Sequence, residues 1–289
     1  MLTKLNLIKL DHPEFNNLGI YVSVLNLEHI GEKINGNKFF KLKYNLEQAI
    51  AEGKKKLLTF GGAYSNHIYA TAAAGKEYNL QTIGIIRGDE LNSNSNRILN
   101  AARNMGMEFK FVSRDEYRRK EEKNFIENLK NEFGNFYLLP EGGSNDLAVK
   151  GCAEIPGLVK EDFDWICCAC GTGGTAAGIY RGLNQGQKVL GIPVLQASEY
   201  FETKIADLLS LDKLPENIIL NHRFHFGGYA KSDETLRNFS ENFSKDYGMS
   251  LDPIYNSKMF YAIFKLISEG FFLNGEKVVC VNTGGNYKL

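Results

Sequence analysis

Lys38 stands where a turn meets a helix, a position from which a lysine can do covalent chemistry. The turn is Asn35-Gly36-Asn37, and four apolar residues at helical spacing predict the buried face of the following helix: Leu42, Leu46, Ala49 and Ile50. Phe39 and Phe40 come directly after the lysine, and burial among such rings would lower the pKa of its amine. A neutral amine can attack an aldehyde and form a Schiff base. Taken alone, a lysine in a turn is more often a surface residue, so a second feature has to decide.

That second feature is a glycine- and hydroxyl-rich turn between an apolar run and a helical pattern, formed by Gly171, Thr172, Gly173, Gly174 and Thr175. Backbone N–H groups in such a turn converge on an anion, and the helix N-terminus adds a partial positive charge. The two threonine hydroxyls can donate further hydrogen bonds. We therefore expect these five residues to bind a phosphate group.

Two phosphate-bearing cofactors fit this turn. The segment matches G-x-G-x-x-A, which is typical of dinucleotide sites, and Glu199 at the end of the next strand could then bind a ribose. This hypothesis makes the protein a nicotinamide-dependent oxidoreductase, but it gives Lys38 no role. Pyridoxal 5'-phosphate needs both a phosphate-binding turn and a lysine for its Schiff base. The two features together therefore favour pyridoxal phosphate.

Short apolar runs alternate with helical patterns along the chain. Strands are expected at 56–62, 81–87, 108–113, 136–141, 164–170 and 188–196, then once more after residue 210, and the chain closes on the apolar run 277–285. Helices are expected at 65–78, 93–106, 114–133, 144–160, 173–184, 198–210, 232–248 and 255–270. This alternation predicts an α/β fold with open, mainly parallel sheets, and the continuous apolar strands indicate sheets covered on both faces. Ligands of such sheets bind beyond the carboxyl ends of the strands, where the turns GGAYSN, EGGSN, CGTGGT and NTGGN lie.

Composition narrows the possible partners. The chain has 289 residues, 43% of them apolar, and 34 basic residues balance 34 acidic ones. A net charge of zero favours neither nucleic acid nor a membrane surface as partner, and no apolar run is long enough to span a bilayer. Five cysteines without an export signal suggest a cytoplasmic protein without disulfides. The run WICCAC (165–170) fits no zinc pattern, so we expect a buried strand there and no metal site.

The segment NGNKFFKLKY (35–44) resembles the GGNKxRKLEY motif of the 1-aminocyclopropane-1-carboxylate deaminase/D-cysteine desulfhydrase family. These are pyridoxal phosphate enzymes of the tryptophan synthase β-like fold, fold type II. Four further segments resemble family motifs in the same order: GGAYSNH (61–67), the turn 171–175, LDPIYNSK (251–258) and NTGG (282–285). The resemblance covers residues 8 to 285.

The resemblance implies a role for each matching residue. Lys38 would form the Schiff base, Asn66 would bind the phenolic oxygen of the cofactor, and Thr283 would lie near the pyridine nitrogen. Ser65 would contact the substrate carboxylate with help from Asn66 and His67, and Tyr255 and Tyr229 would be the two active-site tyrosines. Simpler alternatives stay open, because Ser65 or Asn66 could only cap a helix and His67 could be a helix residue beside the site. Lys258 is expected to be structural.

Three positions depart from the family pattern. Asn256 follows the second tyrosine, where the deaminases have a glutamate that shares a proton with the pyridine nitrogen and the desulfhydrases have a threonine. Because Asn256 cannot ionise, the ring would withdraw electrons less strongly, which disfavours opening of a cyclopropane more than loss of a thiolate. Tyr64 and Phe40 replace a glutamine and an arginine and are expected to make the surroundings of the cofactor less polar.

We therefore expect a β-eliminating enzyme that converts D-cysteine to pyruvate, sulfide and ammonia, with Lys38 or a tyrosine removing the Cα proton. The alternatives are a 1-aminocyclopropane-1-carboxylate deaminase, the nicotinamide oxidoreductase, and a protein that binds pyridoxal phosphate without turnover. The resemblance also implies a homodimer with a small domain of residues 50–150 and a large domain of residues 1–49 and 151–289. The cofactor would lie in the cleft between the domains.

Overall fold

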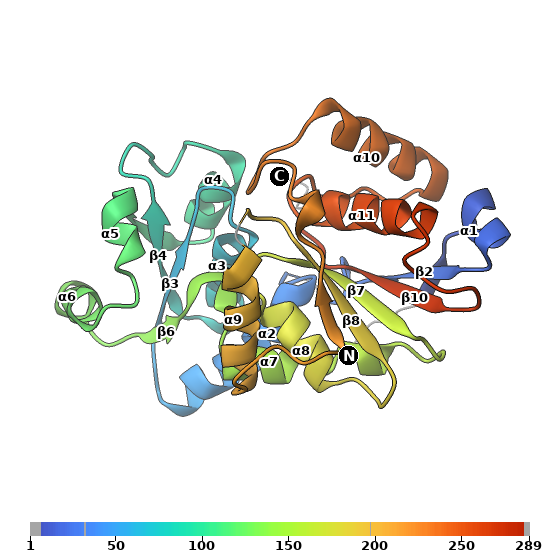
Figure 1. Cartoon of the computed structure of the whole chain (residues 1–289). Coiled ribbons are helices and arrows are strands. Elements are labelled where there is room, and N and C mark those ends of the chain that lie inside the picture. The colour runs from blue at the N-terminus through green and yellow to red at the C-terminus, as the bar shows by residue number, and fades with distance from the viewer. Residues whose placement is uncertain (1–6, 32, 197, 286–289) are drawn as a thin grey trace.

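Two β-sheets, each flanked by helices, organise the chain (Figure 1). The structure is a computed structural model that describes residues 7–31, 33–196 and 198–285. The larger sheet has the strand order β1-β2-β10-β7-β8-β9 and the smaller sheet has the order β5-β4-β3-β6. All paired strands run parallel except β1, which lies antiparallel to β2 at the edge of the larger sheet. The predicted α/β class with mainly parallel sheets is confirmed.

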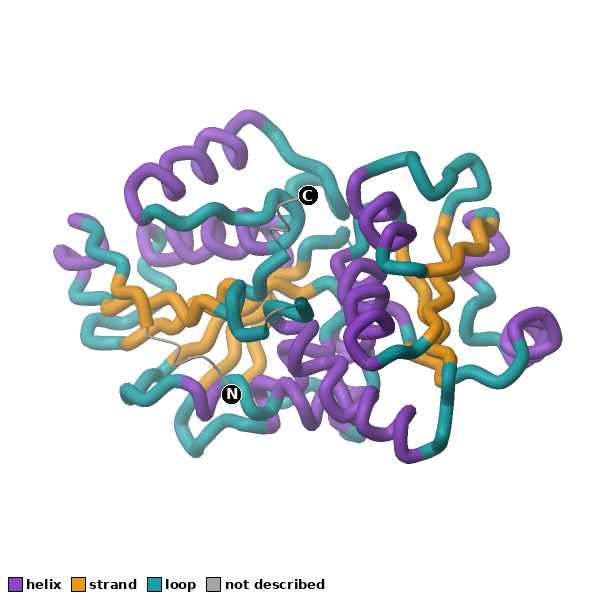
Figure 2. The backbone as a smooth tube through the Cα atoms, turned by 180° about the vertical axis from the view of Figure 1, so that it is seen from behind, coloured by secondary structure: helices purple, strands orange, loops and turns teal. Residues whose placement is uncertain are grey.

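The larger sheet draws its strands from both ends of the chain. Its members are β1 (Leu7–Lys9), β2 (Tyr21–Asn26), β7 (Trp165–Cys170), β8 (Lys188–Pro193), β9 (Ile218–Leu220) and β10 (Lys277–Asn282). Every residue of β7 is buried, which confirms that WICCAC is an apolar central strand. Helices α10 (Glu234–Tyr247) and α11 (Asn256–Ser268) cover one face of the sheet. The other face is covered by α2 (Asn37–Ala51), α7 (Asp146–Cys152), α8 (Gly174–Arg181) and α9 (Ser198–Leu209), as the view from behind also shows (Figure 2).

The smaller sheet comes from one continuous stretch of chain. It consists of β3 (Lys56–Gly61), β4 (Gln81–Arg87), β5 (Met107–Val112) and β6 (Tyr137–Leu139). Helices α3 (Asn66–Tyr78) and α4 (Arg97–Asn104) pack on one face, and α5 (Arg114–Arg118) and α6 (Lys123–Phe133) pack on the other. The two sheets support the division of the chain near residues 50 and 150, which stays a proposal.

Several predicted elements need correction. The helix expected at 114–133 is two helices, because the chain turns after Arg118 and brings Lys120 to Glu141. The helix expected at 144–160 ends at Cys152, and Pro156 starts the short 3₁₀ helix η2 (Pro156–Leu158), since proline ends a regular helix. Ile50 is 50% exposed, whereas the other three residues of the predicted helix face are buried. Sequence patterns also gave no warning of β1, β2 and the short helix α1 (Pro13–Leu18).

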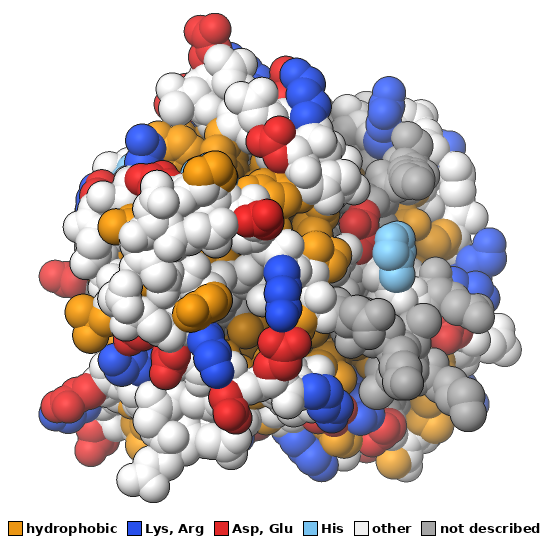
Figure 3. Space-filling model, turned by 90° about the vertical axis from the view of Figure 1, so that its right-hand side faces the viewer, with side chains coloured by type: hydrophobic (Ala, Val, Ile, Leu, Met, Phe, Trp, Pro, Cys, Tyr) orange, Lys and Arg blue, Asp and Glu red, His pale blue; other side chains and the backbone are white. Residues whose placement is uncertain are grey.

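The surface agrees with the balanced composition. On the face shown in Figure 3, acidic and basic side chains are interspersed, as the equal totals of 34 each lead one to expect. Within the described part of the chain, no helix is both long enough and apolar enough to cross a membrane.

Candidate active site

A cavity of about 710 Å³ lies where the carboxyl ends of both sheets meet. Its walls come from the segments that directly follow β3, β6, β7 and β10, and from the first turn of α2. The turns predicted to bind a ligand are therefore brought together, as expected for parallel sheets. A cavity of this size accommodates a cofactor together with a small substrate.

The glycine-rich turn forms an anion-binding cradle at the start of α8. Gly173 has a φ of +77°, a conformation that favours glycine, and the helix begins at the next residue. A Cβ on Gly174 would lie 2.5 Å from the Oγ of Ser144, so only glycine leaves this space open. The hydroxyl of Thr175 accepts a hydrogen bond of 2.8 Å from Asn37 Nδ2. The helix N-terminus and its open backbone suit a phosphate group.

Lys41 is a cation of this cradle that was not among the residues predicted from the sequence. It is only 2% exposed, and its Nζ donates to Ser144 Oγ at 2.8 Å and to the carbonyl oxygen of Gly142 at 3.1 Å. Its Nζ also lies 3.4 Å from Thr172 Oγ1 and 3.1 Å from the place that a Cβ on Gly174 would take. Its spacing in the sequence could have indicated this role, because a residue three positions after Lys38 on a helix lies on the same face as Lys38.

Lys38 is the second residue of α2, because the helix begins at Asn37 and not after the lysine as expected. Its Nζ donates to Asn37 Oδ1 at 3.1 Å, which links it through Asn37 to the phosphate cradle. Burial, reinforced by the positive charge of Lys41, lowers the pKa of Lys38 to about 7. Neither Phe39 nor Phe40 lines the cavity, so their part in the burial of Lys38 stays a prediction. Phe40 instead packs in the core of the larger sheet.

Ser65 and Asn66 open helix α3 on the opposite wall. Ser65 caps the helix by accepting a hydrogen bond of 3.4 Å from the backbone N–H of Ile68, and it also lines the cavity. Both roles considered for Ser65 are thus compatible. Asn66 also lines the cavity, and a Cβ on Gly285 would clash with its Nδ2.

His67 lies beside these residues but suits a different role from the one expected. Thr59 donates its hydroxyl hydrogen to the carbonyl oxygen of Leu139 at 3.0 Å, so at 2.8 Å His67 Nε2 must be the donor to Thr59 Oγ1. Burial holds the pKa of His67 well below its usual value, and the ring is neutral. Its Nδ1 can then only accept a hydrogen bond, and it has no partner among the described residues. An acceptor does not bind a carboxylate, which argues against a direct contact between His67 and the substrate carboxylate.

Tyr229 and Tyr255 form one end of the cavity. Their ring centroids lie 6.2 Å apart in an edge-to-face arrangement. The hydroxyl of Tyr229 donates to the backbone carbonyl oxygen of Tyr64 at 3.3 Å, which connects the two sides of the cleft. Burial raises the pKa of both tyrosines, that of Tyr255 well above its ordinary value. Both hydroxyls therefore keep their protons at neutral pH.

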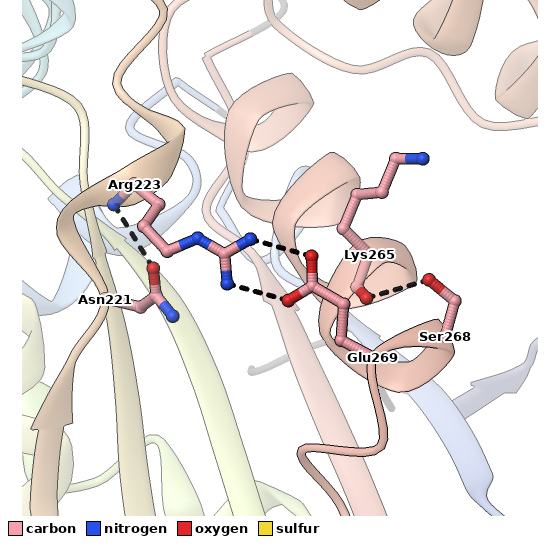
Figure 4. A network of polar contacts seen from close by, with 5 residues as sticks. All are labelled: Asn221, Arg223, Lys265, Ser268 and Glu269. Carbon is pink, nitrogen blue, oxygen red and sulfur yellow. Dashed lines mark hydrogen bonds and ion pairs between the residues drawn. The ribbon is translucent and has the colours of Figure 1, made fainter.

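The loop that carries Tyr229 is anchored at two points. The fully buried Lys258 donates from Nζ to three backbone carbonyl oxygens of neighbouring segments. These belong to Gly228 at 2.7 Å, His225 at 2.8 Å and Val194 at 3.4 Å. Upstream, both guanidinium nitrogens of Arg223 pair with Glu269 at 2.7 Å, beyond the end of α11 (Figure 4). The structural role expected for Lys258 is the fixation of this loop.

Thr283 lines the cavity at the end of β10, but Asn256 does not. Asn256 is fully buried, and its Oδ1 accepts from the backbone N–H of Thr283 at 3.0 Å and from the hydroxyl at 3.1 Å. Its Nδ2 donates to Asp252 and to the carbonyl oxygen of Gly284. All its hydrogen-bonding groups are thus engaged. The expectation that Asn256 itself partners the pyridine nitrogen needs correction, since it can act there only through Thr283.

The other two departures from the family pattern do not reach the cavity. The side chain of Tyr64 is 52% exposed, and neither Tyr64 nor Phe40 is among the lining residues. Neither side chain is part of the cavity wall, and their predicted effect on the polarity around the cofactor stays a prediction.

Other lining residues were not anticipated from the sequence. They are Arg87 at the end of β4, Arg118 on α5 and Tyr200 on α9, whereas Glu141 and Gly142 after β6 belong to the turn EGGSN that was expected to meet a ligand. Of these three residues, only Arg87 had an available signal, which was its place at the end of a strand.

The residues present fit pyridoxal phosphate. A buried amine of lowered pKa, a glycine cradle with its own lysine, and the hydroxyl of Thr283 all face one cavity. They do not fit a dinucleotide, because Glu199 is exposed on α9 and does not line the cavity.

Comparisons with known proteins agree with this geometry. Residues 7–284 match the family of pyridoxal-phosphate-dependent enzymes. The mitochondrial bifunctional D-cysteine desulfhydrase/1-aminocyclopropane-1-carboxylate deaminase of Arabidopsis thaliana is 30% identical, covering 88% of this chain and 70% of that protein. The 1-aminocyclopropane-1-carboxylate deaminase of Methylobacterium nodulans is 26% identical over 88% of this chain and 83% of its own length.

The structural comparison leads to the same group. The crystal structure of a homologue of 1-aminocyclopropane-1-carboxylate deaminase matches with a TM-score of 0.82 and 27% identity, covering 98% of this chain and 90% of that one. The expected fold type and cofactor are confirmed, and the dinucleotide hypothesis is set aside. The chain belongs to the pyridoxal-phosphate-dependent enzymes, in the group of deaminases and lyases that includes these relatives.

Proposed function

We propose that this enzyme eliminates the β-substituent of a small amino acid and that D-cysteine is its substrate, giving pyruvate, sulfide and ammonia. The observation that carries the proposal is that the cavity wall at Thr283 offers no ionisable side chain. The hydroxyl of Thr283 donates a hydrogen bond to the neutral amide of Asn256. Among the described lining residues the only carboxylate is Glu141, and it is engaged by Tyr117 and Lys120. D-cysteine desulfhydration is one of the two activities in the name of the Arabidopsis relative.

Pyridoxal phosphate, when bound, supplies a ring that withdraws electrons and makes the Cα proton of an attached amino acid acidic. Thr283 and Asn256 offer that ring no ionisable partner. They therefore favour a substrate whose leaving group departs readily, as a thiolate does. In the proposed site, Lys41 and the 171–175 turn bind the phosphate, Asn66 donates to the phenolic oxygen, and Ser65 donates to the substrate carboxylate.

Lys38 is the group best suited to accept the Cα proton. With a pKa of about 7, much of its amine is neutral at physiological pH. Tyr229 and Tyr255 keep their protons, so they suit hydrogen-bond donation rather than proton abstraction. The Cα proton moves to Lys38 Nζ, and the Cβ–S bond breaks with both electrons passing to sulfur. Hydrolysis of the resulting enamine then yields pyruvate and ammonia.

A second candidate is deamination of 1-aminocyclopropane-1-carboxylate, which both curated relatives carry in their names. That substrate has no Cα proton, and its ring must open without an anionic leaving group. The neutral pair of Thr283 and Asn256 gives such a reaction less support.

The test is a product assay on the purified enzyme with both substrates. Sulfide and pyruvate from D-cysteine, with little or no 2-oxobutanoate from the cyclopropane, would support the proposal. The reverse pattern would replace it with the deaminase. A shift of the visible cofactor band without product from either substrate would leave a binding protein. L-Cysteine serves as the control for chirality.

The homodimer and the cytoplasmic location stay predictions. Light scattering behind size-exclusion chromatography would test the first, since the mass of one chain is 32.5 kDa.

A further inference from the structure

Arg87 is a cationic residue of the cavity wall to which the proposed chemistry assigns no role. It is the last residue of β4, and its side chain reaches the cavity wall. Lys41 belongs to the phosphate cradle and Lys38 to the Schiff base. Arg118, also in the wall, pairs with Asp115 and is 76% exposed. Among the described residues, Arg87 has no ion-pair partner within 4 Å of its guanidinium.

The guanidinium is held close to the substrate-binding turn. Its Nη2 lies 3.6 Å from the place that a Cβ on Gly62 would take, and the carbonyl oxygen of Gly62 accepts the backbone N–H of Ser65. Its other side lies over the ring of Tyr117, 5.7 Å from the centroid. These two surfaces hold the guanidinium beside the turn that presents Ser65.

Arg87 is also close to the tyrosine end of the cavity. Burial raises the pKa of the Tyr229 and Tyr117 hydroxyls, and the positive charge of Arg87 acts on both in the opposite direction. The carboxylate that could neutralise it, Glu141, instead accepts from Tyr117 at 2.8 Å and pairs with Lys120 at 3.4 Å. The outer half of the cavity thus retains an unneutralised guanidinium, which is suited to an anionic group.

We propose that Arg87 is a specificity residue that receives the β-substituent of the substrate and selects substituents that carry a negative charge or leave with one. This inference rests on the proposed β-elimination and names the class of leaving group. When the Cβ–S bond breaks, the electron pair remains on sulfur, and the guanidinium stabilises the thiolate through charge-assisted hydrogen bonds. A substrate whose β-substituent stays neutral gains nothing from Arg87.

Binding of aspartate and asparagine tests the assignment without requiring turnover. The two amino acids have nearly the same shape and differ in the charge of the β-substituent. Calorimetry on the holoenzyme, with both enantiomers of each, gives the ratio of their dissociation constants. We expect the wild type to bind aspartate at least about tenfold more tightly, which corresponds to about 1.4 kcal/mol. A ratio below about twofold in the wild type would overturn the proposal before any variant is made.

Variants then assign the preference to one residue. Arg87→Gln should abolish the preference for aspartate, and Arg87→Lys should retain part of it. Arg118→Gln removes a positive charge from the same rim and should leave the preference unchanged. If Arg87→Gln and Arg118→Gln lose the preference for aspartate to the same extent, the effect comes from the overall positive charge of the rim, and the proposal is contradicted. Weaker binding of aspartate and asparagine by the same factor in Arg87→Gln would assign Arg87 to the α-carboxylate and contradict it as well.

Kinetics separate this inference from the proposed function. Arg87→Gln should lower kcat/KM for D-cysteine by about 10- to 100-fold, while the visible absorption band of the bound cofactor stays unchanged. If the wild type does not act on D-cysteine, the proposed function fails, and the aspartate preference still tests Arg87.

Discussion

The lowered pKa of Lys38 gives a prediction that can be measured without cofactor or substrate. Burial and the neighbouring charge of Lys41 lower that pKa to about 7. A lysine in an unstructured peptide has a pKa of about 10.4, so only about one amine in 2,500 is neutral at pH 7. Half of the Lys38 amines should be neutral at the same pH. At pH 7 the neutral fraction of Lys38 should therefore be about a thousandfold larger than that of such a lysine.

Competitive labelling measures this difference. The apoprotein is treated with a trace of acetic anhydride between pH 5.5 and 11, and peptide mass spectrometry gives the labelling of each lysine. Since only the neutral amine reacts, labelling of Lys38 should rise with pH, reach half its maximum near pH 7, and level off above pH 8. In Lys41→Met the midpoint should move to higher pH, because a positive charge that disfavours protonation is gone. A midpoint above pH 9.5 in the wild type would refute the reasoning.

Three substitutions test other parts of the structure. Gly174→Ala places a methyl group 2.5 Å from Ser144 Oγ, so titration of the apoprotein should show at least about tenfold weaker cofactor binding; Gly157→Ala, whose added methyl group meets nothing within 4 Å, should bind normally. Lys258→Met leaves three backbone carbonyls without their donor, and urea unfolding should show a loss of about 2–4 kcal/mol in the free energy of unfolding. Asn256→Leu removes a buried amide that makes four hydrogen bonds, and the same assay should show a loss of about 2–4 kcal/mol in the free energy of unfolding. A loss below about 0.5 kcal/mol in Lys258→Met or in Asn256→Leu would contradict the contacts described for that residue.

The sequence was informative wherever chemistry depends on a short motif. Parallel strands place their carboxyl ends together, so the turns after β3, β7 and β10 could be assigned to one site without coordinates. The lysine beside the turn and the glycines of the cradle could be recognised from the sequence, because few other residue types suit those positions. The end of the 144–160 helix could also have been predicted, since Pro156 lies inside it.

The remainder depends on contacts between distant parts of the chain. Lys41 reads as an ordinary helix lysine until Ser144, 103 residues away, gives it a buried acceptor. The tautomer of His67 follows from Thr59 and the carbonyl oxygen of Leu139, which no local pattern links. Asn256 was expected to face the cofactor, but Asp252 and the chain at Gly284 engage its amide. Such pairings decide the direction of a polar group, and a motif fixes only its presence.

The most direct test of this account is to trap the cofactor on the protein. Reduction of the holoenzyme with sodium borohydride converts the Schiff base to a stable pyridoxyl-lysine, which peptide mass spectrometry can locate. We predict one pyridoxyl group per chain, on Lys38, and none in Lys38→Ala. A label on Lys41, which lies in the same cavity, or no label at all would contradict the assignment of Lys38 as the cofactor lysine.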